Sequence, residues 1–185
     1  MGMIRTFIAV ELPEDSKAKI GDYIAVLKER ITGVKWVKPS NLHFTLKFLG
    51  NVAEEIVPDI LQAVEKAVES QRSFSIELEG FGAFPGLKNP RVFWIGIKEG
   101  KRELADSAVT IDEAMEQLGF SREKRRFSPH LTVGRIKKGV RMSSEIEIPF
   151  FEPFGFHVQS ITVMKSTLTP GGPIYEPMGI IPLVS

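Results

Sequence analysis

The chain has 185 residues, enough for one domain of ordinary size with a buried core, and its 43% hydrophobic and 25% charged content is typical of a soluble globular protein. No run of 18 apolar residues occurs, and the N-terminal residues lack the features of a secretion signal, so we expect a cytoplasmic protein without a membrane span. The absence of cysteine excludes disulfides, thiolate metal sites and cysteine nucleophiles.

The net charge of +1 argues against a protein that coats nucleic acid, but the charge is unevenly distributed. Between Phe120 and Arg141 there are eight basic residues and one acid, Glu123, so this segment carries +7 and the rest of the chain −6. A basic segment in an otherwise acidic protein indicates a face that meets an anion. The alternative is an ordinary solvated loop.

Along the first half of the chain, alternating apolar residues predict a strand over residues 3–12. Apolar residues spaced by three and four predict a helix after it, ended by Gly33. Two strands, 34–37 and 43–49, follow on either side of a turn at 39–41. A second amphipathic helix carries its apolar stripe on Ile56, Ile60, Val64 and Val68.

The second half contains elements of the same kinds. A third helix over 104–118 ends at Gly119. Strands are predicted over residues 74–84, 91–97, 130–136, 154–167 and 174–182. Short connections and hairpin-like pairs favour a mixed α+β fold with largely antiparallel sheets, and without a long linker residues 1–185 form a single domain.

Two segments, one starting at His43 and the other at His130, share the pattern His, apolar, Thr, apolar, and they use two of the three histidines in the chain. Successive side chains on a strand point to opposite faces. His43 and Thr45 therefore share one face, as do His130 and Thr132, while the apolar residues point into the core. Each half has a helix before its motif strand, so we expect two similar lobes.

Such a pair of motifs could perform acid–base chemistry on a phosphodiester. A neutral imidazole can take a proton from water, a cationic one can give a proton to a leaving alkoxide, and the threonine hydroxyls can donate to phosphate oxygens. A strained cyclic phosphate suits this arrangement best. The two His-x-Thr pairs are nearly equivalent, so the pattern leaves open which histidine is the acid.

Two other interpretations compete with this one. A single His-x-Thr would be an ordinary histidine on an alternating strand, and only the duplication favours function. A metal site could recruit His157 as a third nitrogen, but the chain lacks cysteines and any HExxH spacing, so we interpret His157 as structural and expect no metal.

At these positions the chain resembles the 2H phosphoesterase superfamily, in particular its branch of 2′-5′ RNA ligases and RNA 2′,3′-cyclic phosphodiesterases. The resemblance extends over nearly the whole chain. It is carried by residues 5–13, 36–37 with 41–50, 81–85 with 90–94, and 128–135.

The resemblance implies a bilobal α+β fold with pseudo-two-fold symmetry, helices packed outside and an active-site cleft between the lobes. It also implies hydrolysis of an RNA 2′,3′-cyclic phosphate to a 2′-phosphate without metal or cofactor. By the same resemblance, His43 is the acid that protonates the leaving 3′ oxygen and His130 the base that activates water. Thr45 and Thr132 would hold the phosphate.

Other candidates for substrate binding follow less directly. Arg135 lies five residues past His130, so strict alternation turns it to the opposite face, yet it remains a candidate phosphate ligand. Phe84, beside a proline at a strand end, is our candidate for stacking a base, with a place in the core as its alternative. Tyr175 and Trp36 are also aromatic candidates, and Trp36 has more claim to packing.

The expected partner is RNA with a cyclic phosphate end, with tRNA fragments among the candidates, and nothing in the sequence calls for more than a monomer. One alternative function is a 2′-5′ RNA ligase that joins tRNA half-molecules, as some members of the resembled family do. Another is a non-catalytic RNA-binding module, because the basic segment and exposed aromatic residues would suit that role too.

Overall fold

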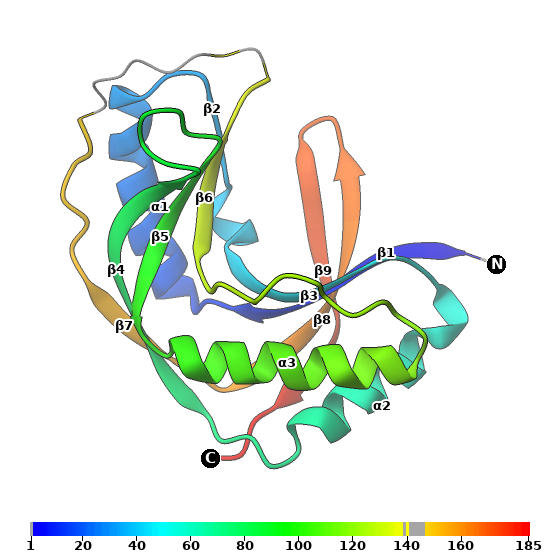
Figure 1. Cartoon of the computed structure of the whole chain (residues 1–185). Coiled ribbons are helices and arrows are strands. Elements are labelled where there is room, and N and C mark those ends of the chain that lie inside the picture. Colours follow the sequence, from blue (N-terminus) through cyan, green and yellow to red (C-terminus); the bar gives the residue numbers. More distant parts are fainter. Residues whose placement is uncertain (1, 139, 141–146) are drawn as a thin grey trace.

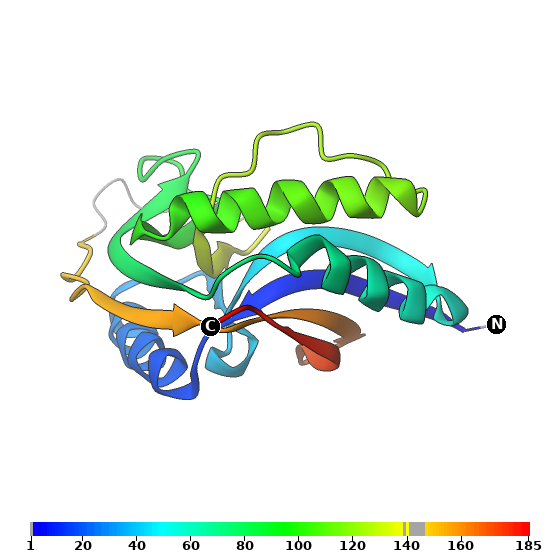
Figure 2. The same cartoon turned by 90° about the horizontal axis from the view of Figure 1, so that it is seen from below.

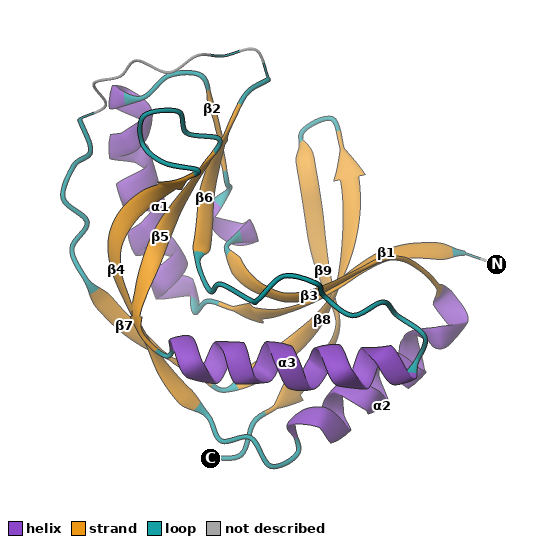
Figure 3. Cartoon of the chain, in the orientation of Figure 1, coloured by secondary structure: helices purple, strands orange, loops and turns teal. Residues whose placement is uncertain are grey.

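The computed structural model of the chain describes residues 2–138, 140 and 147–185. It confirms the α+β class (Figures 1 and 3). The helices are α1 (Glu14–Arg30), α2 (Val57–Val68) and α3 (Lys101–Gln117), with short 3-10 turns η1 (Pro39–Asn41) and η2 (Glu54–Ile56). The strands are β1 (Met3–Glu11), β2 (Val34–Trp36), β3 (His43–Ala53), β4 (Phe74–Phe84), β5 (Val92–Glu99), β6 (Leu131–Ile136), β7 (Phe154–Val158), β8 (Ser160–Thr169) and β9 (Gly172–Pro182).

The strands form two antiparallel sheets, and each sheet contains one motif strand. Sheet A has the order β3-β1-β8-β9, and sheet B has the order β2-β6-β5-β4-β7. The lobes are not the two halves of the sequence, because β2 pairs with β6 from the second half, and β8 pairs with β1 from the first. The chain therefore crosses between the lobes, and residues far apart in sequence meet at their junction.

Helices cover the outer faces of both sheets, as expected. Figure 2 shows α2 and α3 next to each other against one face of sheet A, where Leu61 of α2 packs on Gly179 of β9. On sheet B the ring of Tyr23 from α1 lies 6.0 Å from that of Phe81 in β4. Most residues of the predicted apolar stripes are buried, whereas Ile56 lies in η2 and is half-buried, and Leu118, at the end of the predicted third helix, is 40% exposed. Among the described residues, no helix has both the length and the apolar character needed to span a membrane.

The prediction of one strand over residues 154–167 is wrong. The chain leaves sheet B after Val158 and enters sheet A at Ser160. Between them, the carbonyl of Gln159 accepts a hydrogen bond of 2.8 Å from the amide of Leu183. The apolar residues on both sides of this crossover form a continuous pattern, and such a pattern does not tell which sheet a strand joins.

Candidate active site

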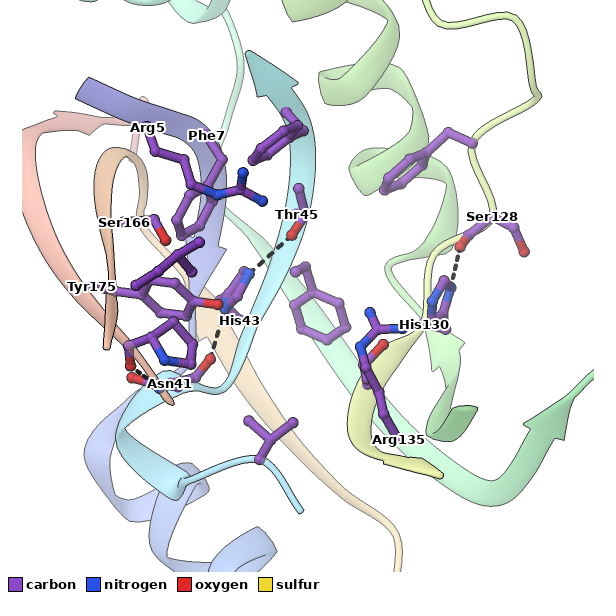
Figure 4. A pocket seen from close by; sticks show the side chains of 17 residues that line it. Arg5, Phe7, Asn41, His43, Thr45, Ser128, His130, Arg135, Ser166 and Tyr175 are labelled. Atoms are coloured by element: carbon purple, nitrogen blue, oxygen red, sulfur yellow. Dashed lines mark hydrogen bonds between the residues drawn. The ribbon is translucent and has the colours of Figure 1, made fainter. Parts of the chain in front are cut away.

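A cavity of about 420 Å³ lies where the two motif strands approach each other. Its lining includes His43 and Thr45 from β3, Thr132 from β6, and His130, which immediately precedes β6. The two histidines face this cavity from opposite sides in Figure 4. The apolar neighbours on both strands are buried in the core, as strand alternation requires. The structure thus brings together all four side chains of the two His-x-Thr pairs.

Each motif histidine is held by a hydrogen bond from its Nδ1 to the backbone carbonyl two residues earlier. Nδ1 of His43 donates to the carbonyl of Asn41 at 2.7 Å, and Nδ1 of His130 donates to the carbonyl of Ser128, also at 2.7 Å. A carbonyl can only accept, so each ring carries its proton on Nδ1 when neutral and presents Nε2 as the acceptor nitrogen. In both motifs the fixed ring therefore has Nε2 as the nitrogen available for proton transfer.

The surroundings of His43 favour its neutral form. Burial lowers the pKa of His43, outweighing the hydrogen bond to Asn41 and the nearby charge of Glu11, which act to raise it. Two aromatic rings contribute to that burial, with centroids 4.9 Å (Phe7) and 5.2 Å (Tyr175) from the imidazole. Nε2 lies 2.9 Å from Oγ1 of Thr45, so in the neutral state the hydroxyl donates to it.

Arg135 lines the cavity, contrary to the expectation from strict alternation. Thr132 pairs with Trp94 of β5 and Gly134 with Phe93, so Val133 is an extra residue in β6. This β-bulge reverses the alternation and returns Arg135 to the face of Thr132. A side chain at Gly134 would approach Trp36 to 2.8 Å, so a glycine allows the bulged strand to pack against β2.

A second arginine, Arg5 of β1, also lines the cavity, with its guanidinium 4.5 Å from the ring centre of Phe48. Burial raises the pKa of Tyr175, and the charges of Arg135 and Arg5 partly offset that rise, so both cations act on this end of the cavity. Within the described residues neither arginine has an acidic partner. The cavity therefore attracts anions.

Sequence reasoning missed Arg5 and Phe48 as cavity residues. Arg5 and Phe7 alternate on β1, which was a usable signal for a shared face. Alternation alone did not tell which face of β1 meets the cavity, because the pairing of β1 with β3 was unknown. Phe48 reaches the cavity only because β3 also contains a bulge.

The remaining aromatic candidates occupy different places. Phe84 is 40% exposed and therefore not a core residue, and its ring stands edge-on to His130 at 5.0 Å. Tyr175 lines the cavity. Trp36 stacks on Phe93 at 5.8 Å, in keeping with a packing role.

His157 lies away from the two motifs. It is on β7, exposed, with its Nδ1 3.2 Å from the hydroxyl of Ser75. In the part of the chain that the structure describes, no cluster of three or more His, Asp or Glu side chains is placed to hold a metal ion.

The cations of the basic segment, residues 120–141, lie in several different environments. Arg122 is paired with acids of α3, Arg135 lines the cavity, and residues 137–138 follow the end of β6. Residues 124–126 are exposed cations without an ion pair among the described residues, on the loop that leads to the cavity. Arg141 lies outside the described residues.

Comparison with known proteins identifies the family of this chain. The family model described as LigT like phosphoesterase matches residues 10–94 and 95–175, so each matched segment contains one His-x-Thr pair. This chain belongs to the LigT-like phosphoesterase family. The expectation that the chain is a 2H phosphoesterase is confirmed, and so is the expectation that it is an enzyme.

Curated relatives extend over nearly the whole chain. The RNA 2′,3′-cyclic phosphodiesterase of Archaeoglobus fulgidus is 38% identical over 179 residues, covering 96% of this chain and 99% of that protein. The RNA 2′,3′-cyclic phosphodiesterase of Thermotoga maritima is 36% identical over 177 residues, covering 94% and 92%. The crystal structure of Escherichia coli LigT complexed with 3′-AMP matches all of both chains, with a TM-score of 0.80 and 26% identity.

Proposed function

We propose that this LigT-like phosphoesterase is an RNA 2′,3′-cyclic phosphodiesterase that opens a cyclic phosphate terminus to a 2′-phosphate. The observation that carries the proposal is the pair of imidazoles, His43 and His130, on one cavity with matching Nδ1 hydrogen bonds. The curated relatives described above bear the same activity in their names.

In the proposed reaction the two histidines divide the proton transfers. His130, neutral at Nε2, takes a proton from a water molecule as its oxygen attacks phosphorus. The bond from phosphorus to O3′ breaks in line with the attack, and His43, protonated at Nε2, gives that proton to O3′. The products are a 2′-phosphate and a 3′-hydroxyl. Each proton transfer typically contributes about 10²–10⁴ in rate.

His43 must gain a proton before it can act as the acid, although burial favours its neutral form in the free enzyme. The substrate itself supplies a reason for protonation. A phosphodiester brings a negative charge into the cavity, and an opposite charge within a few ångströms favours the imidazolium. Binding and protonation of His43 are thereby coupled.

The other cavity residues suit the charge that develops on the phosphate. The hydroxyls of Thr45 and Thr132 can donate to its non-bridging oxygens, and Thr45 already lies 2.9 Å from Nε2 of His43. Arg135 adds a fixed positive charge with several donors. Together with the histidines these groups supply the acid, the base and the charge stabilisation, so the proposed reaction is independent of metal.

The proposal is tested with an RNA that ends in a 2′,3′-cyclic phosphate, incubated with the protein in the presence of EDTA. We expect ring opening to a 2′-phosphate, identified by ³¹P NMR. An intact ring, a 3′-phosphate product or activity that disappears on chelation would overturn it. Adding an RNA with a free 5′-hydroxyl to the same reaction measures ligation against hydrolysis.

A further inference from the structure

Lys47 lies four residues past His43 on the same strand, yet it faces away from the cavity. The bulge in β3 turns its side chain toward α3, where its ammonium group is paired with the carboxylate of Asp112. The same ammonium donates to the carbonyl of Ser121 at 2.7 Å. Both charged side chains are buried, with exposed fractions of 6% and 9%.

Asp112 extends this contact to the segment after α3. Its two carboxylate oxygens each lie 3.2 Å from the amide nitrogen of Glu123, and Nε of Arg122 donates to one of them at 3.3 Å. Residues 121–123 are thereby held from β3 through Lys47 and from α3 through Asp112. Burial acts to raise the pKa of Asp112, but the hydrogen bonds to its carboxylate outweigh it and lower the pKa.

The held segment leads directly to the second motif. From Glu123 the chain continues along the exposed loop to Ser128, whose carbonyl accepts the Nδ1 proton of His130. A short chain path thus joins the buried ion pair to the second imidazole. The first imidazole, His43, lies on the strand that carries Lys47 itself.

Stability alone gives little reason for such a pair. Burying two charges costs desolvation energy that their attraction often does no more than repay, and apolar residues of similar shape are commonly as stable. The equivalent position in the other motif strand is Gly134, which packs on Trp36 without a charge. A buried ion pair differs from apolar packing in fixing direction and distance.

We propose that Lys47 and Asp112 are positioning residues that set the separation of His43 and His130 by tying β3 to the segment that enters the second motif. This inference rests on the proposed function for its kinetic consequence. A displacement of about 1 Å at a reacting group can cost about 10² in rate. Loss of the tie should therefore lower kcat and leave KM nearly unchanged, because the phosphate ligands stay in place.

The test compares three variants. K47M removes the ammonium, and K47M/D112N removes both charges while the amide oxygen of Asn can still accept from Glu123, so this variant stays informative if an unpaired Asp112 impairs folding. K98M is the matched control, because Lys98 forms an ion pair of 2.9 Å with Glu77 at the surface. The readouts are kcat and KM on the cyclic-ended RNA, the melting temperature, and NMR of the histidine rings.

With three histidines in the chain, each ring signal can be assigned. For K47M and K47M/D112N we expect kcat to fall at least about tenfold with KM within about threefold, and the ring signals of His130 to shift while those of His157 do not. K98M should match the wild type. Unchanged kcat and His130 signals in a folded K47M/D112N protein would overturn the inference. If the wild type fails to open the ring, the proposed function falls, and the His130 signals still decide this inference.

Discussion

Phe48 and Arg135 occupy equivalent positions in the two motif strands. Each lies five residues past its motif histidine and lines the cavity. In β3 the pairing with β1 skips Leu46, and in β6 the pairing with β5 skips Val133, so the bulge falls at the same place in both motifs. The pseudo-two-fold relation thus extends beyond the His-x-Thr residues to a shared backbone irregularity, which presents an aromatic ring in one lobe and a cation in the other.

This placement predicts that Arg135→Gln weakens catalysis through lost stabilisation of the phosphate. Hydrogen bonds to a charged group contribute about 1.5–3 kcal/mol, so kcat/KM should fall by roughly 10- to 100-fold. Arg135→Lys keeps the charge but not the planar fork of donors, and we expect it to be intermediate. Lys138→Gln, at a basic residue beyond β6, is the control and should match the wild type in the same kinetic assay. Equal kinetics for Arg135→Gln and wild type would remove Arg135 from the site.

The sequence was sufficient to predict the α+β class, most of the elements and the shared face of each His-x-Thr pair, because period-2 alternation determines which residues of a strand share a face. The same assumption of strict alternation placed Arg135 on the wrong face. A bulge adds one residue to the strand and inverts the alternation beyond it. Nothing in the amino-acid sequence of residues 131–135 indicates that extra residue. Strict alternation therefore gives the correct face up to Thr132 and the wrong face beyond it, although Arg135 itself was kept as a candidate phosphate ligand.

Long-range pairing was the other limit of the sequence. Arg5 belongs to the cavity only because β1 lies between β3 and β8, and the crossover at Gln159 sends one apolar run into two sheets. Both facts depend on which strands are neighbours. Local periodicity contains no information about which strands are neighbours, so the places of Arg5 and Gln159 could be determined only from the assembled sheets.

The histidine variants give the most direct test of the catalytic pair. We expect His43→Ala and His130→Ala each to lower kcat by at least about 10² if they are the acid and the base. Binding of the substrate RNA should persist, as measured by a titration with the inactive variants. His157→Ala is the matched control, since this exposed histidine lies on β7 outside the cavity. A non-catalytic RNA-binding module would instead tolerate all three changes.

The pH dependence of kcat/KM should reveal the role of His43. Burial lowers the pKa of His43 below its ordinary 6.5. An acid must be protonated to act, so kcat/KM should decrease by about tenfold per pH unit above that lowered pKa. The decrease should therefore begin on the acidic side of pH 6.5, and His43→Ala should abolish it. If His43→Ala instead abolishes a decrease toward low pH, His43 is the base and the two roles are exchanged.

Phe84 can be tested as a base-stacking residue. Its ring is 40% exposed and stands edge-on to His130, so it could either receive a base or support the imidazole. Stacking of a base on an aromatic ring contributes about 1–3 kcal/mol, so Phe84→Ala should lower kcat/KM by roughly 5- to 100-fold on cyclic-ended RNA.

A substrate without a base separates the two roles of Phe84. On ribose 2′,3′-cyclic phosphate, the Phe84→Ala variant should be as active as the wild type. An equal loss on both substrates would mean that Phe84 acts through His130 and stacks no base. Phe150→Ala, at a phenylalanine that is 83% exposed, controls for the loss of a surface aromatic ring.

The exposed cations at 124–126 predict that the enzyme binds the body of the RNA as well as its end. This loop leads into Phe127 and Ser128, which line the cavity. Replacing the three cations by serine should raise KM for a cyclic-ended oligonucleotide and leave the cyclic mononucleotide unaffected. For single strands, each phosphate contact contributes about 0.7 to the slope of log affinity against log salt, so the slope should become shallower by up to about 2.

A control of equal charge shows whether position or net charge is responsible. Lys28, Lys66 and Lys101 are exposed on the three helices and none lines the cavity. Their triple serine variant changes the net charge by the same amount, and we expect its salt slope and KM for the oligonucleotide to match the wild type. Equal effects of the two triple variants would mean that the RNA responds only to the overall charge. The loop would then be an ordinary solvated one, because contacts to phosphates at defined places depend on where the cations are.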